Sequence, residues 1–326
     1  MAHPETAALP TLAQIEAAAS VVYREFPPTP QYRWALLSER LGTDCWVKHE
    51  NHTPVGAFKI RGGLTYFHEL ARQGELPKEV VSATRGNHGQ SIGWAARAHG
   101  VGCTIVVPRG NSAEKNAAMR ALGVQLIEHG DDFTESADYA RQLAAERGAL
   151  MVPSFHMDLV RGVATYWWEF LRAVPDLEVA YVPIGLGSGA CAAIVARQAL
   201  NHPVRIVGVV SAHARTYADS IAAGRVVEAA VSTRLADGMA VRRADERALE
   251  LLARHLDHVV AVTDEEVAAS MRALYEDTHN LAEGAGAAAF AAALQERSQL
   301  AGRRVGVVVT GANVDASLMS AVLNEG

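Results

Sequence analysis

Short apolar, β-branched segments alternate with longer amphipathic segments along most of the chain. Between residues 79 and 200 four strand-like segments are each followed by a helix-length one: 79–83 and 87–99, 103–108 and 113–122, 124–129 and 133–147, 179–185 and 189–200. Further strands are predicted at 204–210, 258–263 and 304–310, with a helix beginning near Asp264. This rhythm is typical of βαβ units, so it predicts an α/β fold with mainly parallel sheets covered by helices.

Local signals mark some of the element boundaries. Asn111 or Ser112 is expected to cap the helix at 113–122, and Thr263 with Glu266 forms a capping-box pattern. The segment 212–245 has no clear periodicity, which predicts a long surface connection. No low-complexity linker marks a domain boundary.

The composition limits the classes of molecule that the protein is expected to bind. The 326 residues carry 30 Lys and Arg against 36 Asp and Glu, a formal charge of −6 without a basic block, which argues against nucleic acid and against an anionic membrane surface. No leader pattern and no long apolar run is present, so no membrane span is expected. Small molecules are therefore the expected partners. The three separated cysteines are typical of reduced thiols, which fits a cytoplasmic protein.

The segment "NHTPVGAFKIRGG", residues 51–63, contains the first candidate for chemistry, Lys59. Most lysines are solvated surface charges. Val55, Phe58 and Ile60 give this one an apolar surround, which would lower the pKa of its ammonium group. Lys59 is therefore a candidate nucleophile.

A second segment, "PIGLGSGA" at 183–190, follows an apolar strand and begins a helix. Its glycines would let backbone N–H groups surround an anion at the helix N-terminus. Gly185, Gly187 and Ala190 also fit a dinucleotide fingerprint, but the next strand ends at Val210 and Ser211 without the acid that would bind a ribose. A phosphorylated cofactor fits better than a nicotinamide dinucleotide, and a purely structural tight turn is the alternative.

Two more segments place polar residues after strands. "SATRGNHGQS", 82–91, crowds Thr84, Arg85, Asn87 and His88 at the start of a helix, where a substrate carboxylate could bind, or where Asn87 could simply cap the helix. "VVVTGANVD", 307–315, ends a strand at Thr310, the usual edge for ligands in an open α/β sheet.

Together and in this order, the four segments resemble the fold-type II pyridoxal-phosphate enzymes, specifically the serine/threonine dehydratase (ammonia-lyase) and serine racemase family, over nearly the whole chain. "LAEGAGA" from Leu281 is similar to a glutamate-bearing helix start of that family. The resemblance implies a tryptophan synthase β-like fold with two open α/β domains. The expected bounds are 1–65 and 152–326 for a large domain that binds the cofactor, and 66–151 for a small domain inserted in it.

The resemblance also implies residue roles. Lys59 would attach pyridoxal 5'-phosphate covalently and later remove the substrate's α-proton, while Phe58 packs beside the ring. The other expected cofactor-binding residues are Asn87, Gly185, Leu186, Gly187, Ser188, Gly189, Glu283 and Thr310. The expected substrate-binding residues are Thr84, Arg85, Gly86 and His88.

The implied reaction is dehydration of a β-hydroxy amino acid such as L-threonine or L-serine, giving a 2-oxo acid and ammonia. A neutral Thr310 cannot hold a proton on the pyridine nitrogen as an aspartate does, which favours β-elimination over transamination. Alternatives are a 3-hydroxyaspartate or phenylserine dehydratase, an amino-acid racemase, or a non-catalytic binding protein. A homodimer is expected.

Three positions depart from the family pattern. Arg85 replaces the serine that racemases use as a proton donor, and an arginine is a poor acid, so racemisation should be weak. Its charge either leans into solvent or binds a second substrate carboxylate. Val210 and Thr216 stand where the family's cation site needs carboxylates, so no metal is expected.

Overall fold

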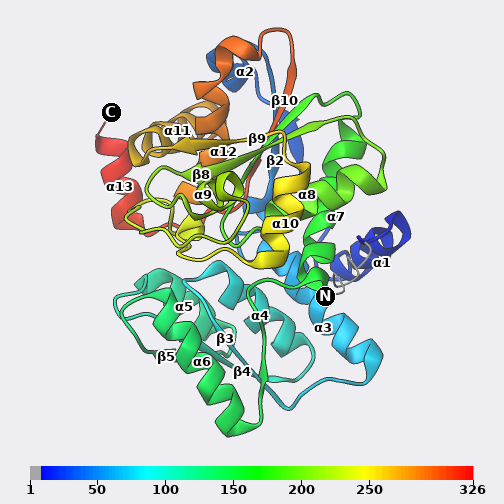
Figure 1. Ribbon diagram of the computed structural model, residues 1–326, viewed down its shortest axis with the longest axis vertical. Helices are drawn as coiled ribbons and strands as arrows, with labels where there is room; N and C mark the ends of the chain where they lie inside the picture. Colours follow the sequence, from blue (N-terminus) through cyan, green and yellow to red (C-terminus); the bar gives the residue numbers. More distant parts are fainter. Residues whose placement is uncertain (1–8, 326) are drawn as a thin grey trace.

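The computed structural model describes residues 9–325 as thirteen α-helices, three short 3-10 helices and ten strands (Figure 1). The sequence predicts no leader peptide at residues 1–10, and this segment lies mostly outside the described residues. The strands are β1 (Gln31–Arg33), β2 (Asp44–His49), β3 (Glu79–Ala83), β4 (Gly102–Val107), β5 (Gln125–Glu128), β6 (Leu150–Met151), β7 (Val179–Pro183), β8 (Arg205–Ser211), β9 (His258–Val262) and β10 (Arg304–Val309).

The five helices that the hydrophobic pattern predicts are present at nearly the predicted positions, and the remaining helices were not predicted. They are α1 (Leu12–Val22), α2 (Ala35–Leu41), α3 (Lys59–Gln73), α4 (Asn87–Ala98), α5 (Ala113–Ala121), α6 (Phe133–Arg147), α7 (Met157–Ala173), α8 (Ser188–Ala199), α9 (Thr216–Ala223), α10 (Glu246–His255), α11 (Asp264–Thr278), α12 (Gly284–Gln295) and α13 (Ala316–Asn324), with 3-10 helices η1 (Glu50–His52), η2 (Asp237–Met239) and η3 (Arg297–Gln299). Ser112 caps α5, and Thr263 with Glu266 forms the predicted capping box of α11.

The strands form two sheets. The larger has the order β1-β2-β10-β7-β8-β9 and is parallel except for the β1–β2 pair, and the smaller, fully parallel sheet has the order β5-β4-β3-β6. The smaller sheet uses only residues 79–151, and the larger uses strands on both sides of that segment. Figure 1 shows the two sheets in separate parts of the molecule. The domain bounds given above stay a prediction.

Helices cover both faces of the larger sheet. Along β7, Val179 and Tyr181 pack into one apolar cluster with α11 and α12, whereas Ala180 and Val182 pack into another with α7 and α8. This alternation follows from the two-residue period of a strand. The alanine-rich α12 is buried almost throughout, as a helix that is apolar on every side must be.

The structure corrects the prediction for residues 212–245. The segment contains α9 and η2, and Ala236 and Met239 are buried. It is therefore only partly a surface connection, because its second half folds inward toward the carboxyl ends of the strands. No helix within residues 9–325 is both long enough and apolar enough to cross a membrane.

Candidate active site

A cavity lies between the two sheets at the carboxyl ends of β3, β7 and β10, the usual position for ligands in open α/β sheets. Three of the predicted segments follow β3, β7 and β10 directly, and the fourth leads into α3. The cavity is lined by every residue predicted for the site: Phe58, Lys59, Thr84, Arg85, Gly86, Asn87, His88, Gly185, Leu186, Gly187, Ser188, Gly189, Glu283 and Thr310. The structure thus brings together residues up to 252 positions apart in the chain, from Phe58 to Thr310.

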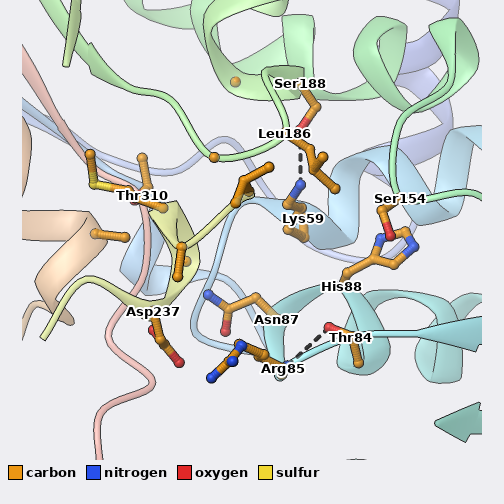
Figure 2. A pocket seen from close by; sticks show the side chains of 18 of the residues that line it. Lys59, Thr84, Arg85, Asn87, His88, Ser154, Leu186, Ser188, Asp237 and Thr310 are labelled. Carbon is orange, nitrogen blue, oxygen red and sulfur yellow. Dashed lines mark hydrogen bonds between the residues drawn. The ribbon is translucent and has the colours of Figure 1, made fainter. Parts of the chain in front are cut away.

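Lys59 is the first residue of α3, and backbone contacts fix it beside the end of β10. The Phe58 N–H donates to the Thr310 carbonyl at 3.0 Å, and Ala57 forms an isolated antiparallel β-bridge with Gly311. The Lys59 ammonium donates to Ser188 Oγ at 2.9 Å (Figure 2). Burial lowers its pKa from the ordinary value to about 8, as the apolar surround predicted. An amine with such a pKa is partly unprotonated near neutral pH and can act as a nucleophile or a base.

The loop between β7 and α8 has the shape of an anion cradle. Gly187 adopts a left-handed backbone with φ of 96°, which glycine allows without strain. A Cβ atom on Gly185 would lie 2.2 Å from the Gly238 carbonyl oxygen, so only glycine fits there. The loop opens into the N-terminus of α8, where unpaired N–H groups and the helix dipole favour a phosphate.

Asn87 is held by its neighbours rather than serving as a helix cap. Gly86 occupies the N-cap position of α4, so the alternative that Asn87 is merely the cap is wrong. The Asn87 amide donates to Glu283 Oε1 at 2.6 Å and accepts a hydrogen bond from Asn313 at 2.8 Å. Both ends of the amide are thereby oriented, with one N–H left for a ligand.

The turn after β3 offers donors at the start of α4. Thr84 Oγ1 accepts a hydrogen bond from the Gly86 N–H at 2.9 Å, which stabilises the turn. His88 is buried, and its Nε2 atom has no hydrogen-bond partner among the described residues. Burial, together with the charge of Lys59, lowers the pKa of His88 to about 3 against an opposing backbone hydrogen bond with Pro153. His88 is therefore a neutral ring that can exchange a hydrogen bond with a ligand.

Sequence reasoning missed several residues that line the cavity. Lys115 from α5 is buried and donates to Asp237 at 2.6 Å, and its ammonium lies 3.9 Å from Glu283. Burial and the charge of Asp237 raise the pKa of Glu283 to about 7, although Lys115 and Asn87 oppose them. The other missed residues are Ala83, Phe133, Ser154, Pro183, Gly238, Met239, Ala240, Val241 and Ala285.

Val210 and Thr216 occupy the two positions where the family's cation site needs carboxylates. Val210 is buried on β8, and the Thr216 hydroxyl donates to the Val241 carbonyl at 2.5 Å. Neither side chain offers the negatively charged oxygen that a hard divalent cation prefers.

The features that fit pyridoxal phosphate are the lysine, the glycine cradle and the strand-end threonine in one cavity. A family model described as "Pyridoxal-phosphate dependent enzyme" matches residues 22–311. The chain belongs to this family. Its members use pyridoxal phosphate, and the predicted cofactor, fold class and enzymatic nature are confirmed. The individual residue roles stay predictions.

Proteins named for their activities, and a solved structure, are similar to this chain over most of its length. L-threonine ammonia-lyase of Geobacter sulfurreducens is 38% identical over 293 residues, which cover 89% of this chain and 72% of that protein. L-threo-3-hydroxyaspartate ammonia-lyase of Saccharomyces cerevisiae is 30% identical, and the match covers 94% of each protein. The processed form of threonine deaminase isoform 2 from Solanum lycopersicum has a TM-score of 0.89 at 28% identity and covers 96% of this chain and 91% of that one.

Proposed function

We propose that this enzyme is a dehydratase that converts a β-hydroxy amino acid, such as L-threonine or L-serine, into a 2-oxo acid and ammonia. The observation that carries the proposal is the position of Lys59, with its lowered pKa, between the glycine cradle and the turn after β3. The ammonia-lyase and threonine deaminase names of the relatives support it. When bound, pyridoxal phosphate holds the substrate's amino group and withdraws electrons from its α-carbon.

Residues of the chain bind the cofactor, orient the substrate and transfer the proton. The N–H groups at the start of α8 bind the phosphate, and Phe58 packs beside the ring. The turn at Thr84, Gly86 and His88 binds the substrate's carboxylate, which orients the Cα–H bond toward Lys59. The Lys59 amine accepts the α-proton, and the electrons of the broken Cα–H bond form the Cα=Cβ bond as the Cβ–O bond breaks. The β-hydroxyl leaves as water after it takes up a proton, which the Lys59 ammonium group supplies.

The rest of the reaction needs little from the protein. Loss of water gives an enamine, which tautomerises to an imine once released. Water then hydrolyses the imine to the 2-oxo acid and ammonia. Thr310 stands after the end of β10 and brings no negative charge to the cavity, which favours elimination over reactions that need a long-lived carbanion.

The experiment is a substrate panel with the purified holoenzyme. Release of 2-oxo acid and ammonia is measured from L-threonine, L-serine, 3-hydroxyaspartate and phenylserine, with 2-aminobutyrate as the control that lacks the β-hydroxyl. We expect equal amounts of the two products from at least one β-hydroxy amino acid and none from 2-aminobutyrate. Racemisation of the panel without 2-oxo acid release would contradict the proposal.

We also propose that the enzyme is a cytoplasmic homodimer. The three cysteines are free thiols, and Cys45 and Cys191 are buried, which is typical of reducing compartments. The helices α2 and α13 both pack against α11, and each of the three helices carries an exposed apolar side chain, namely Leu36 on α2, Tyr275 on α11 and Leu323 on α13. Such a surface suits a second copy of the chain. Light scattering of the purified enzyme measures the mass directly.

A further inference from the structure

Arg85 extends into the active-site cavity from the turn between β3 and α4. Figure 2 shows its guanidinium group directed toward the side of the cavity where Asp237 lies. The side chain is only partly exposed, and its Nε atom is buried without a hydrogen-bond partner among the described residues. An arginine that merely leaned into solvent would have its Nε atom hydrated.

The acidic side chains of the cavity are already engaged by other residues. Lys115 donates to Asp237 at 2.6 Å, and Asn87 donates to Glu283 at 2.6 Å. Within residues 9–325, no carboxylate lies within ion-pair distance of Arg85. Arg85 is therefore a cation whose donors remain available to a ligand.

The charge around Arg85 favours an anion. Arg85 and Lys115 bring two positive charges to this side of the cavity, and Asp237 brings one negative charge. Glu283 is only partly ionised near neutral pH, because burial raises its pKa to about 7. The sum is positive, so a negatively charged group is attracted to the space beside Arg85.

The cofactor's phosphate cannot be that group. Ser188 and Leu186 of the glycine cradle lie at one end of the cavity and Arg85 lies at the other, with Lys59 between them (Figure 2). Arg85 is also a direct neighbour of Thr84 and Gly86, the residues assigned to the substrate's α-carboxylate. Arg85 therefore lies on the side of the cavity proposed for the substrate rather than beside the phosphate cradle.

We propose that Arg85 binds a second carboxylate on the substrate, so that the enzyme prefers acidic β-hydroxy amino acids such as 3-hydroxyaspartate. This inference rests on the dehydratase function proposed above and specifies its substrate class. The guanidinium group can pair with a carboxylate through two parallel N–H···O bonds, an arrangement that a neutral side chain cannot replace. One such pair is expected to change binding by tenfold or more.

Binding to the holoenzyme tests the inference without requiring catalysis. L-aspartate and L-asparagine have the same shape, differ by one charge, and lack the β-hydroxyl that would be eliminated. Calorimetry should give a Kd at least tenfold lower for aspartate than for asparagine in the unmodified enzyme. In Arg85→Gln this ratio should fall to near one, and Arg85→Lys should keep part of it.

The matched control is Arg109→Gln. Arg109 is an exposed arginine that pairs with Asp131 and does not line the cavity. It should leave the aspartate preference unchanged. Circular dichroism of Arg85→Gln and Arg85→Lys checks that both variants fold. Equal affinity for aspartate and asparagine in the unmodified enzyme, or an unchanged preference in Arg85→Gln, would overturn the inference.

Kinetics separates this inference from the dehydratase assignment. Arg85→Gln should lower kcat/KM for 3-hydroxyaspartate, assayed as L-threo and L-erythro isomers, by tenfold or more while changing that for threonine less. Turnover of threonine without any preference for aspartate would refute the role of Arg85 and leave the dehydratase standing. A clear preference for aspartate without 2-oxo acid from any β-hydroxy amino acid would support the role of Arg85 and refute the dehydratase assignment.

Discussion

Replacing Arg61 with methionine should destabilise the protein strongly, because Arg61 lies at the centre of a buried charge network behind the active-site lysine. Its side chain is fully buried on α3, two residues after Lys59. The guanidinium group donates to both oxygens of Glu50, at 2.7 and 2.9 Å, and to both oxygens of Glu169, at 2.6 and 3.1 Å. Lys48 donates to Glu169 at 2.6 Å. Two cations thus balance two carboxylates.

The magnitude follows from this balance. Burial alone would lower the pKa of Arg61, but Glu50 and Glu169 outweigh burial and raise it, so the arginine stays charged. Methionine has a similar volume but leaves Glu50 buried with only a hydroxyl partner, Thr29. Breaking a buried pair in this way costs about 3–5 kcal/mol. That is a large part of the roughly 5–15 kcal/mol by which folded domains are stable.

The assay is urea unfolding followed by circular dichroism at one fixed cofactor concentration, since bound cofactor adds to stability. Arg61→Met combined with Glu50→Met removes the unpaired carboxylate, so the double variant should regain at least half of the loss. The surface control is Arg33→Met, whose exposed pair with Asp44 should contribute less than about 1 kcal/mol. Additive losses for the two buried substitutions, or a loss no larger than that of Arg33→Met, would refute the reasoning.

Two further predictions concern pH and metal. Because the folded protein raises the pKa of Glu283 from its ordinary value to about 7, Glu283 contributes stability at low pH that is lost as the pH rises from about 4.5 through 7. In cofactor-free enzyme the Tm of Glu283→Gln, relative to that of the unmodified protein, should therefore increase between about pH 5 and 8, and parallel Tm curves would count against it. Chelator should leave the 2-oxo acid release unchanged, because Val210 and Thr216 offer no carboxylate. Activity lost in chelator and restored by magnesium or calcium would show that a cation site exists elsewhere.

The hydrophobic pattern predicted most of the sheet architecture correctly. The segment "EVVSA" is β3 at the predicted residues, and the strands that follow differ by a few residues at most. Parallel strands buried on both faces form continuous apolar runs, which is why they stand out in the sequence. The short β1 and β6 lack such runs, β2 contains the charged Asp44 and Lys48, and none of these three strands was predicted.

The candidate site was predictable where short motifs carry the chemistry. The glycine cradle, Lys59 and the turn after β3 are contiguous segments whose residue types imply a ligand. Lys115 and Asp237 could not be predicted as site residues, because in the sequence each resembles an ordinary surface charge. Only the fold brings their charged groups to 2.6 Å from each other. The Arg61 network was missed for the same reason, since Glu169 is 108 residues away from Arg61 in the chain.

The segment 212–245 shows a further limit of sequence patterns. Beyond α9 it contains only the short η2 as regular structure, and Asp237, Gly238, Met239, Ala240 and Val241 line the cavity rather than forming part of a helix or strand surface with a regular period. Asp237 and Gly238 read as a turn, yet the backbone of Gly238 packs against Gly185 of the cradle. Such contacts between distant loops leave no local signal.

The most direct test of the central claim is to identify the lysine that holds the cofactor. Borohydride treatment of the yellow holoenzyme fixes the cofactor to its lysine, and peptide mapping by mass spectrometry then locates the modified residue. We expect a single modified peptide containing Lys59, and a colourless, inactive Lys59→Ala protein that still folds. A cofactor fixed to another lysine, or a Lys59→Ala protein that remains yellow and releases 2-oxo acid, would contradict this claim.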